Sequence, residues 1–494
     1  MLQLLGINNY GFFRDELYYI ACSHHLAWGY IDQPPLIALI AWVARHAFGQ
    51  SLIAYRIFPV LAGAGTVFFT GLLARELGGC LFAQFLSATV IFFAPLSLAF
   101  DSFLSMNAFE PLIWLICAWL AVRIVRGGSP RLWLLLGAVA GVGLENKHTM
   151  LVFGFALVAG LAVSGEVRGT RSDFLRSKWF WLGGLLALAL FLPNLIWEAT
   201  HGWSQIHVVQ NAQEFKNVQL SPARFLGEQV LFMQPLSLPI WLGGLVWYLF
   251  GEGGKRFRFL GWAYLIVVAV FIVLHGKSYY AVPVYPVLAA AGGVAFEQFT
   301  ITPTRRWLRL AYPVALVLGG LITLPYGVPL LRVDTFIRYT RALPYARWVK
   351  TENDATAVLP QNYADMIGWE HMATTIAGVY HHLPLAEQST CAILAGNYGE
   401  AGAIDYYGPK LGIPPVISGH NNYFLWGPRD YSGACVILFG ERAEQYRNYF
   451  GEVERVASIS EPLAMPSEQN LAVYLCRKPQ APLRVLWPRF KMII

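Results

Sequence analysis

Two adjacent carboxylates near the amino end, Asp15 and Glu16, are the residues of this sequence best suited to chemistry. One carboxylate can accept a proton from an attacking hydroxyl or amine. Its neighbour can hold a divalent cation, which neutralises the charge on a departing phosphate. A third acid, Asp32, follows just before a Pro-Pro pair. The alternative is structural, because acids in the first turn of a helix are stabilised by the positive end of its dipole.

Several basic side chains could serve the same reaction. Arg56, Lys147 and Lys277 are candidate phosphate-binding residues, since a cation stabilises charge that develops on a leaving oxygen. Lys147 could instead be a lysine that extends its charged end to the membrane surface. His201 is either a second metal ligand beside Glu16 or a residue that packs at the membrane interface.

The composition predicts an integral membrane protein. The chain has 494 residues, of which 56% are hydrophobic and only 13% are charged, against about 25% charged residues in typical soluble domains. The net charge of +7 does not indicate a nucleic-acid partner, because the basic residues lie in short loops between apolar runs. The six cysteines are scattered without a CxxC motif, so neither a zinc site nor a disulfide framework is expected.

The apolar runs predict a multi-span helical bundle over residues 1–330. Each run has roughly the 20 residues that a bilayer core requires. The expected spans are 52–75, 80–97, 105–124, 131–146, 149–165, 179–198, 222–250, 258–275, 279–297 and 307–330.

Alternate loops between these spans are basic, which predicts the orientation. The basic set is Arg75; Arg123, Arg126 and Arg131; Arg168, Arg171, Arg176 and Lys178; Lys255, Arg256 and Arg258; and Arg305, Arg306 and Arg309. By the positive-inside rule these loops are cytoplasmic. The first loop, about 10–51, and residues 331–494 then lie outside, on the periplasmic side of a bacterial inner membrane. That placement of the first loop requires a preceding span, so we expect that the sequence lacks a first helix.

The first loop is expected to be structured and to cover the bundle. Tyr18, Tyr19 and Trp28 are typical of a helix that lies on the membrane surface. Pro34 would then turn the chain into a second surface helix over about 36–48.

In the segment 331–494 charged residues become more frequent and apolar runs become shorter. Its alternating strand and helix patterns predict a small α/β domain. Strands are expected at 391–399, 414–420, 434–440 and 471–477, with helices at 400–412 and 441–450. The glycine-rich turn at 396–402 is either a phosphate-binding loop or a simple strand-to-helix turn. It lacks both GxGxxG and GxxxxGKS, which favours the simple turn.

This orientation gathers the polar residues of the bundle at its non-cytoplasmic end. They include Asp101, Asn107, Glu110 and the run Glu145-Asn146-Lys147-His148. Ionisable residues in or beside membrane spans are costly and tend to be functional.

Several motifs resemble one family of membrane enzymes. The stretch RDELYYIACSHHLAWGYIDQPPLIALIAW and the shorter ENKHTM, PNLIWEATHGW and KSYYAVPVYPVLA carry the resemblance. The sequence resembles bacterial lipid-linked sugar transferases of the glycosyltransferase C superfamily. It is most similar to family 39, which groups protein O-mannosyltransferase-like and aminoarabinose-transferase-like enzymes.

The resemblance implies a fold and a reaction. It implies a helical body with an extended first periplasmic loop, and transfer of a hexosyl or pentosyl group from a polyprenyl-phosphate donor with inversion. The expected partners are that lipid-linked donor and membrane lipid, while the acceptor stays open. The implied roles are Asp15 as base or as organiser of acceptor and metal, Glu16 as its support, Asp32 closing the first-loop pocket, and Lys147, Lys277, Tyr279 and Asn107 binding substrate.

Two departures from the family pattern leave the divalent cation and the donor identity open. Asn107 stands where many members have Asp, although Asp101 and Glu110 lie nearby, and Glu198 stands where many have Asn. The alternative function is a transporter or flippase of lipid-linked sugars. Transporters favour inverted repeats and a site at the membrane midplane, whereas here the ionisable residues cluster at one end.

Overall fold

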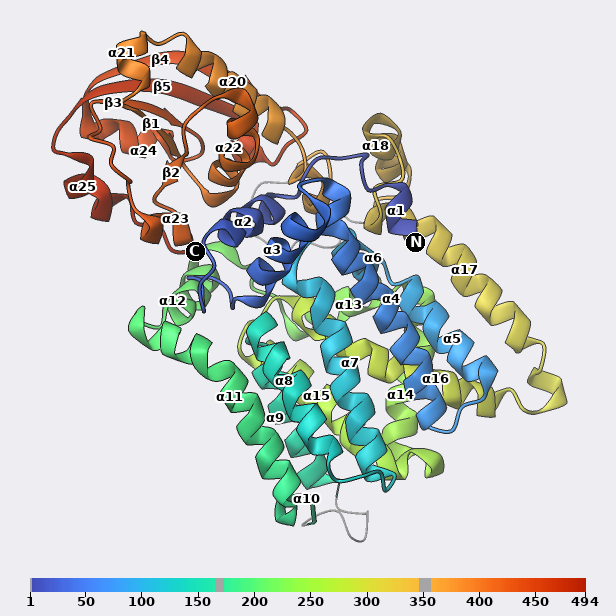
Figure 1. Cartoon of the computed structure of the whole chain (residues 1–494). Coiled ribbons are helices and arrows are strands. Elements are labelled where there is room, and N and C mark those ends of the chain that lie inside the picture. Colours follow the sequence, from blue (N-terminus) through green and yellow to red (C-terminus); the bar gives the residue numbers. More distant parts are fainter. Residues whose placement is uncertain (1, 165–172, 346–356) are drawn as a thin grey trace.

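The computed structural model describes residues 2–164, 173–345 and 357–494. Figure 1 shows a long helical bundle with a small sheet domain, the tail domain, at one of its ends. Two of the basic loop residues, Arg168 and Arg171, lie outside the described residues.

The described residues contain six helices, some with a leading 3-10 turn, that are long and apolar enough to cross a membrane. They are α4 (Leu52–Glu76), α7 (Met106–Val125), α11 (Lys178–Thr200), η3 with α15 (Glu252–Val273), η4 with α16 (Ser278–Phe299) and η5 with α17 (Pro303–Gly327). A bent pair, α13 (Pro222–Phe232) with η2 and α14 (Pro235–Phe250), turns by 96°. Shorter apolar helices are α5 (Leu81–Phe92), α8 (Leu132–Asn146) and α9 (Met150–Val163). Six of the predicted spans coincide with the long helices, three with the shorter apolar helices, and the one at 222–250 with the bent pair.

Short helices precede, separate or follow the long ones. They are α1 (Leu2–Leu5), α6 (Pro95–Phe100), α10 (Asp173–Arg176), α12 (Ser204–Asn211), α18 (Val333–Ala342) and α19 (Gln361–Ala364). The last long helix ends at Gly327, close to the predicted domain boundary at residue 330.

Small residues let neighbouring helices of the bundle approach closely. A Cβ atom at Gly137 of α8 would lie 2.0 Å from the carbonyl oxygen of Gly183 on α11. Larger residues fill the core elsewhere, where Trp114 of α7 stacks on Phe153 of α9 with ring centroids 4.5 Å apart. Association of helices in lipid relies on such packing, because lipid chains are as apolar as the side chains themselves.

The first loop forms two helices across one end of the bundle (Figure 1). These are α2 (Arg14–His24) and α3 (Leu36–Phe48), so the predicted helix at 36–48 is present. Trp28 is 65% exposed, as expected for an interfacial residue, but Tyr18 and Tyr19 are 1% and 4% exposed. The surface interpretation of the two tyrosines was therefore wrong, because both belong to a buried cluster that the first loop shares with the tail domain.

The tail domain is a five-stranded mixed sheet with strand order β2-β1-β3-β5-β4. The strands are β1 (Cys391–Ala395), β2 (Ile417–Ser418), β3 (Cys435–Phe439), β4 (Phe450–Ser460) and β5 (Asn470–Pro479). β1 pairs in parallel with β2 and β3, whereas β5 is antiparallel to β3 and β4. The helices are α20 (Trp369–His381), α21 (Leu385–Gln388), α22 (Tyr398–Leu411), α23 (Asn421–Trp426), α24 (Ala443–Tyr446) and α25 (Leu483–Leu486).

Two predictions for the tail domain are wrong in the segment that leads into its edge strand. The predicted helix at 441–450 shortens to α24 and a 3-10 turn, and β4 follows where no strand was expected. β4 lies at the sheet edge and exposes a run of polar residues. Charged residues are common on such edges because they discourage pairing with other chains, and they mask the strand pattern.

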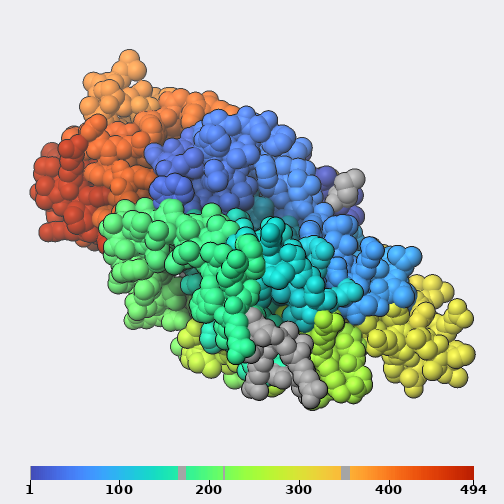
Figure 2. All heavy atoms as spheres, turned by 60° about the horizontal axis from the view of Figure 1, so that its bottom comes forward, coloured from blue at the N-terminus to red at the C-terminus, as the bar shows by residue number. Residues whose placement is uncertain are grey.

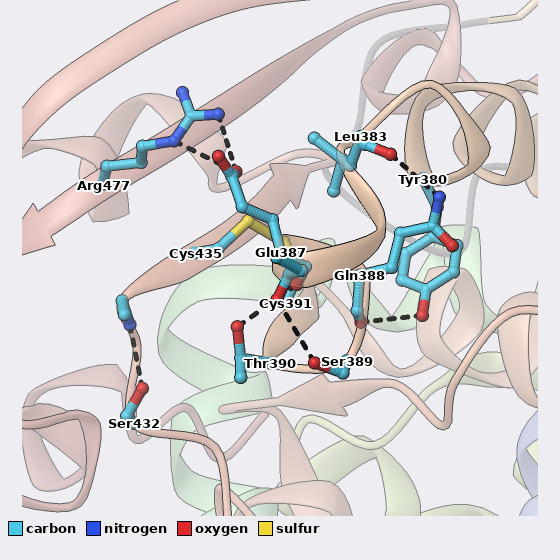
Figure 3. Close-up of a disulfide and its surroundings, with 12 residues drawn as sticks. Tyr380, Leu383, Glu387, Gln388, Ser389, Thr390, Cys391, Ser432, Cys435 and Arg477 are labelled. Atoms are coloured by element: carbon cyan, nitrogen blue, oxygen red, sulfur yellow. Dashed lines mark hydrogen bonds and ion pairs between the residues drawn. A yellow bond between two sulfur atoms is a disulfide. The ribbon is translucent and has the colours of Figure 1, made fainter.

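A disulfide joins Cys391 of β1 to Cys435 of β3 (Figure 3). The expectation that the cysteines form no disulfide was therefore wrong. These residues are 44 positions apart in sequence, but the parallel register places them directly opposite each other. Only the strand pairing reveals this proximity.

The tail domain rests on the first loop. The space-filling view shows the orange and red tail beside the blue amino-terminal segment (Figure 2). Among its contacts, the amide nitrogen of Ile31 donates to Oδ1 of Asn422 at 2.7 Å, and the hydroxyl of Tyr406 donates to the carbonyl oxygen of Gln50.

Candidate active site

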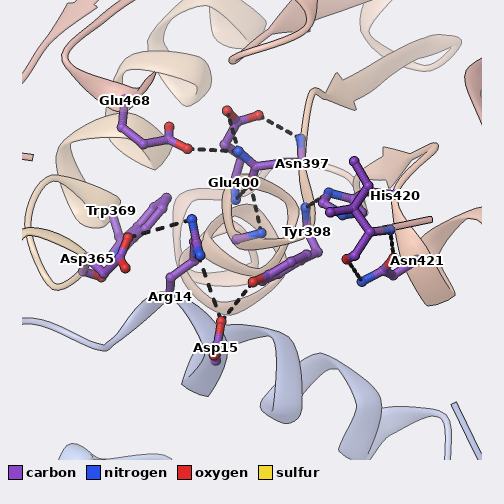
Figure 4. Close-up of polar contacts among 12 residues, drawn as sticks. Arg14, Asp15, Asp365, Trp369, Asn397, Tyr398, Glu400, His420, Asn421 and Glu468 are labelled. Carbon is purple, nitrogen blue, oxygen red and sulfur yellow. Dashed lines mark hydrogen bonds and ion pairs between the residues drawn. The ribbon is translucent and has the colours of Figure 1, made fainter. Parts of the chain in front are cut away.

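The side chains of the two acids in the first turn of α2 point in different directions. The side chain of Asp15 is 30% exposed and lies under the tail domain (Figure 4). The side chain of Glu16 is completely buried against the bundle. Adjacent positions of a helix do not share a face, so the pair cannot act on one ligand as two neighbouring carboxylates.

Asp15 contacts both its own helix and the tail. The hydroxyl of Tyr398, the first residue of α22, donates to Oδ1 of Asp15 at 2.9 Å. Arg14 places its Nε 3.9 Å from the same oxygen, and its Nη1 lies 3.7 Å from Asp365. The carboxylate is therefore oriented and partly exposed, as a general base should be.

Glu16 has a structural environment. It accepts hydrogen bonds from the backbone nitrogens of Phe13 and Leu104, each at 2.8 Å. Arg56 adds two more, from Nε at 3.0 Å and Nη2 at 2.7 Å. Arg56 also donates from Nη1 to the carbonyl oxygen of Ile7 and from Nη2 to that of Gly11. These bonds favour a positioning role for Glu16 and Arg56 over the expected metal and phosphate roles.

Asp32 lies beside the tyrosine pair of α2. The hydroxyl of Tyr18 donates to Oδ1 of Asp32 at 2.8 Å. Burial raises the pKa of Tyr19 well above its ordinary value, and the charges of Asp15 and Asp32 raise it further. Tyr279 from η4 also raises the pKa of Tyr19. The buried phenol of Tyr19 therefore responds to the charges of both acids.

Lys147, at the end of α8, is held by an amide oxygen and a carboxylate oxygen. Its Nζ donates to Oδ1 of Asn107 at 2.8 Å and to Oε2 of Glu110 at 3.1 Å. The same Nζ lies 4.5 Å from the ring centroid of Tyr280 and 5.6 Å from that of Tyr279. These contacts fix the ammonium group at the bundle end and replace the expected alternative of a lysine directed freely to the membrane surface.

Tyr279 connects the two lysines that were predicted to bind phosphate. Its ring centroid lies 5.9 Å from Nζ of Lys277 and 5.6 Å from Nζ of Lys147. Phe100 packs against the same tyrosine, with ring centroids 5.6 Å apart. The structure thus brings Asn107, Lys147, Lys277 and Tyr279 together.

The motifs from distant helices are tied to the first loop. A ring nitrogen of His148 pairs with Oδ1 of Asn194 at 3.0 Å. The Nδ2 of Asn194 donates to the carbonyl oxygen of Trp28 at 2.9 Å. Thr149 donates to Glu110. The segment after α8, α11 and the first loop therefore form one polar network.

His201 does not join this network. It is exposed and stacks on Trp197 with ring centroids 4.0 Å apart, and a ring nitrogen lies 2.8 Å from the Trp197 carbonyl oxygen. Across residues 2–164, 173–345 and 357–494 no group of three or more His, Cys, Asp or Glu could hold a metal ion. Glu16 and His201 do not fit a shared cation, so the divalent cation stays a prediction without assigned ligands.

Sequence reasoning missed Tyr398 and did not assign Tyr280. Tyr280 stands beside the predicted Tyr279, and the KSYY motif is a signal that could have found it. Tyr398 follows the glycine-containing turn after β1, which is a strand-to-helix turn as favoured. No local pattern connects Tyr398 with Asp15, 383 residues away.

Two kinds of comparison place the chain among known proteins. Residues 32–197 match the family model described as dolichyl-phosphate-mannose-protein mannosyltransferase. The chain is similar in structure to ArnT from Cupriavidus metallidurans bound to undecaprenyl phosphate, with a TM-score of 0.61, 14% identity and coverage of 96% of each chain. No curated protein matches the sequence.

A second solved structure shares the fold. It is the archaeal oligosaccharyltransferase AglB from Archaeoglobus fulgidus in complex with an inhibitory peptide and a dolichol-phosphate. The match has a TM-score of 0.53 and 12% identity, and it covers 91% of this chain and 69% of AglB. The protein is thus a multi-pass membrane protein with the glycosyltransferase C fold, and its resemblance to the family 39 transferases is confirmed.

Proposed function

We propose that the protein transfers a hexosyl or pentosyl group from a polyprenyl-phosphate-linked donor to an acceptor at the periplasmic face of a bacterial inner membrane. The observation that carries this proposal is the arrangement of Asp15. Its carboxylate is oriented by Tyr398 and remains partly exposed. A second group of candidate residues is gathered around Tyr279, whose ring centroid lies 5.6 Å from Nζ of Lys147 and 5.9 Å from Nζ of Lys277.

In this reaction Asp15 acts as the general base. It accepts the proton of the acceptor hydroxyl or amine as that group attacks the anomeric carbon. The bond between this carbon and the phosphate oxygen breaks, and polyprenyl phosphate leaves with the electron pair. Direct displacement inverts the anomeric centre. Positioned proton transfer of this kind contributes about 10²–10⁴-fold to rate.

The lysine cluster receives the phosphate. Lys147 and Lys277 supply positive charge where negative charge develops on the leaving oxygen. Asn107 and Glu110 hold Lys147 in place, and fixed charges of this kind need little rearrangement during the reaction. The lipid phosphates bound by ArnT and AglB support a lipid-phosphate ligand for a chain of this fold.

Two observations support the periplasmic location. Disulfides persist in oxidising compartments and are rare in the cytosol, and Cys391–Cys435 lies in the tail domain (Figure 3). At the opposite end of the bundle, basic residues such as Arg126 and Arg256 pair with Glu76 and the Val125 carbonyl oxygen. Basic loops at that end favour its cytoplasmic placement.

A genetic comparison of cell-envelope glycans tests the proposal. A strain that lacks the gene is compared with its parent by mass spectrometry, and is then complemented with the wild type or with Asp15→Asn. We expect one glycan modification to disappear and to return only with the wild type, at equal amounts of protein in the membrane. Identical envelope glycans in the parent and the deletion strain would contradict the proposal.

A further inference from the structure

We propose that Tyr398 of the tail domain is a positioning residue for Asp15, so that the tail completes the active site. The proposal rests on the proposed function, because it assumes that Asp15 is the base. Figure 4 shows the phenol of Tyr398 directed at the Asp15 carboxylate from the opposite domain. The two residues belong to the first turns of α22 and α2.

The backbone around Tyr398 is fixed by a closed set of hydrogen bonds. Asn397 accepts from the backbone nitrogens of Gly399 and Glu400, at 2.9 and 3.0 Å. In return Glu400 accepts from the backbone nitrogen of Asn397 at 3.0 Å and from that of Gly396 at 2.8 Å. This reciprocal capping box satisfies the free amides at the start of α22, so the position from which the phenol projects is defined.

The ring of Tyr398 is confined on several sides. Its centroid lies 4.9 Å from that of Tyr18 and 4.8 Å from that of His420. The guanidinium of Arg14 lies over the same ring at 5.5 Å. Because Tyr398 is buried and its ring is packed in this way, its hydroxyl has a fixed direction, and that direction is Oδ1 of Asp15.

Glycines bring α22 close enough for this contact. A Cβ atom at Gly399 would lie 2.3 Å from Cγ of Arg14, and one at Gly402 would lie 2.9 Å from the backbone carbon of Leu17. Any larger residue at either position would push the helices apart. These two glycines of α22 therefore serve the close approach of α2.

The chemical consequence concerns the two oxygens of Asp15. A hydrogen bond to Oδ1 holds the carboxylate plane and leaves Oδ2 to receive the acceptor proton. A base that rotates would spend part of its time in unproductive orientations, and small losses of alignment reduce rate strongly. Tyr398 thus acts through Asp15 and does not itself exchange a proton with substrate.

Removal of the hydroxyl alone should not detach the tail. The interface also contains the bond from Ile31 to Asn422, the bond from Tyr406 to Gln50, and the stack of His25 on Trp426 with centroids 4.4 Å apart. Tyr398→Phe keeps the ring contacts and deletes the bond to Asp15. The matched control is Tyr431→Phe, which deletes an exposed bond to the Pro415 carbonyl oxygen elsewhere in the tail.

The first test measures turnover and donor affinity of the full-length protein in lipid nanodiscs. We expect Tyr398→Phe to lower kcat by about 10- to 100-fold, the range for loss of a hydrogen bond to a charged group. The KM for donor and the Tm should stay near wild type, and Tyr431→Phe should behave as wild type. A purely structural role would lower Tm with no selective loss of kcat, and that result, like an unchanged kcat, would overturn the proposal.

A double-mutant cycle with Asp15→Glu separates this proposal from the proposed function. Asp15→Glu displaces the carboxylate and retains a base, so activity stays measurable. If Tyr398 acts through Asp15, Tyr398→Phe should change kcat less than twofold in the Asp15→Glu protein. Multiplicative losses would overturn the positioning role and leave the proposed function intact. Wild-type turnover of Asp15→Asn would instead overturn the proposed function, and with it this inference.

Discussion

Arg56 forms a bidentate ion pair with Glu16, with Nε 3.0 Å from Oε1 and Nη2 2.7 Å from Oε2. Both side chains are completely buried. The pair joins α4 of the bundle to the first turn of α2, where Asp15 lies. It therefore fixes the helix that presents the proposed base.

Breaking this pair should destabilise the protein. Loss of one partner leaves an uncompensated buried charge, which costs about 3–5 kcal/mol. Arg56→Met and Glu16→Gln should each lower the Tm in detergent, whereas Arg338→Met, at an exposed position on α18, should not. The double variant Glu16→Met with Arg56→Met should be more stable than Arg56→Met alone. Thermal unfolding of either single variant at the wild-type temperature would show that the pair is not structural.

Lys277→Ala should weaken donor binding. The ammonium is proposed to contact the donor phosphate, and a hydrogen bond to a charged group contributes about 1.5–3 kcal/mol, so the Kd for polyprenyl phosphate should rise at least about tenfold. Lys255→Ala, in a basic loop at the other end of the bundle, is the matched control. Equal Kd values for Lys277→Ala and wild type would remove Lys277 from the phosphate site.

The stability of the tail should fall as the pH rises. Burial raises the pKa of Glu468 to about 7, although a hydrogen bond from Asn397 opposes this shift. Burial also raises the pKa of Glu400. Because the folded state binds these protons more tightly than the unfolded state, the stabilisation is complete below about pH 4.5 and is lost as the pH rises through about 7.

Glu468→Gln checks this dependence, because glutamine imitates the protonated acid. Its Tm should fall less than that of the wild type between about pH 5 and about pH 8. The control Glu454→Gln lies on the exposed edge strand and should retain the wild-type dependence. A Tm profile of Glu468→Gln that matches the wild type across this window would exclude Glu468 as the titrating group.

The disulfide gives a test of sidedness in intact cells. Cys391 and Cys435 should react with a thiol-specific maleimide only after reduction, because they are paired in an oxidising compartment. Replacing both by serine should lower stability by about 2–5 kcal/mol. Labelling of both cysteines in unreduced, freshly denatured cells would indicate a cytosolic tail. The buried Cys22, which is unpaired, serves as the internal control for labelling after denaturation.

The sequence predicts the membrane part of the fold well. Apolar runs correspond to helices, six of them long enough to cross a membrane, and the proline pair correctly marks the start of α3. These features are local, so periodicity and composition suffice. Local patterns do not predict two features of the tail domain. β4 has exposed charged residues because it is an edge strand, so it lacks a clear strand pattern. Cys391 and Cys435 are brought together only by the pairing of β1 with β3.

The candidate site is only partly predictable for the same reason. Lys147, Lys277 and Tyr279 lie together as the motifs imply. Asp15 and Glu16 look equivalent in sequence, and only tertiary packing assigns one to the tail interface and the other to Arg56.

Turnover by purified Asp15→Asn tests the central claim most directly. The protein is reconstituted in nanodiscs with the lipid-linked donor and the acceptor identified from the envelope glycans, and release of polyprenyl phosphate is followed. Asp334→Asn, at an exposed position on α18, is the control. Loss of the base should slow turnover by about 10²–10⁴-fold with donor binding retained. Turnover within twofold of the wild type would contradict the account.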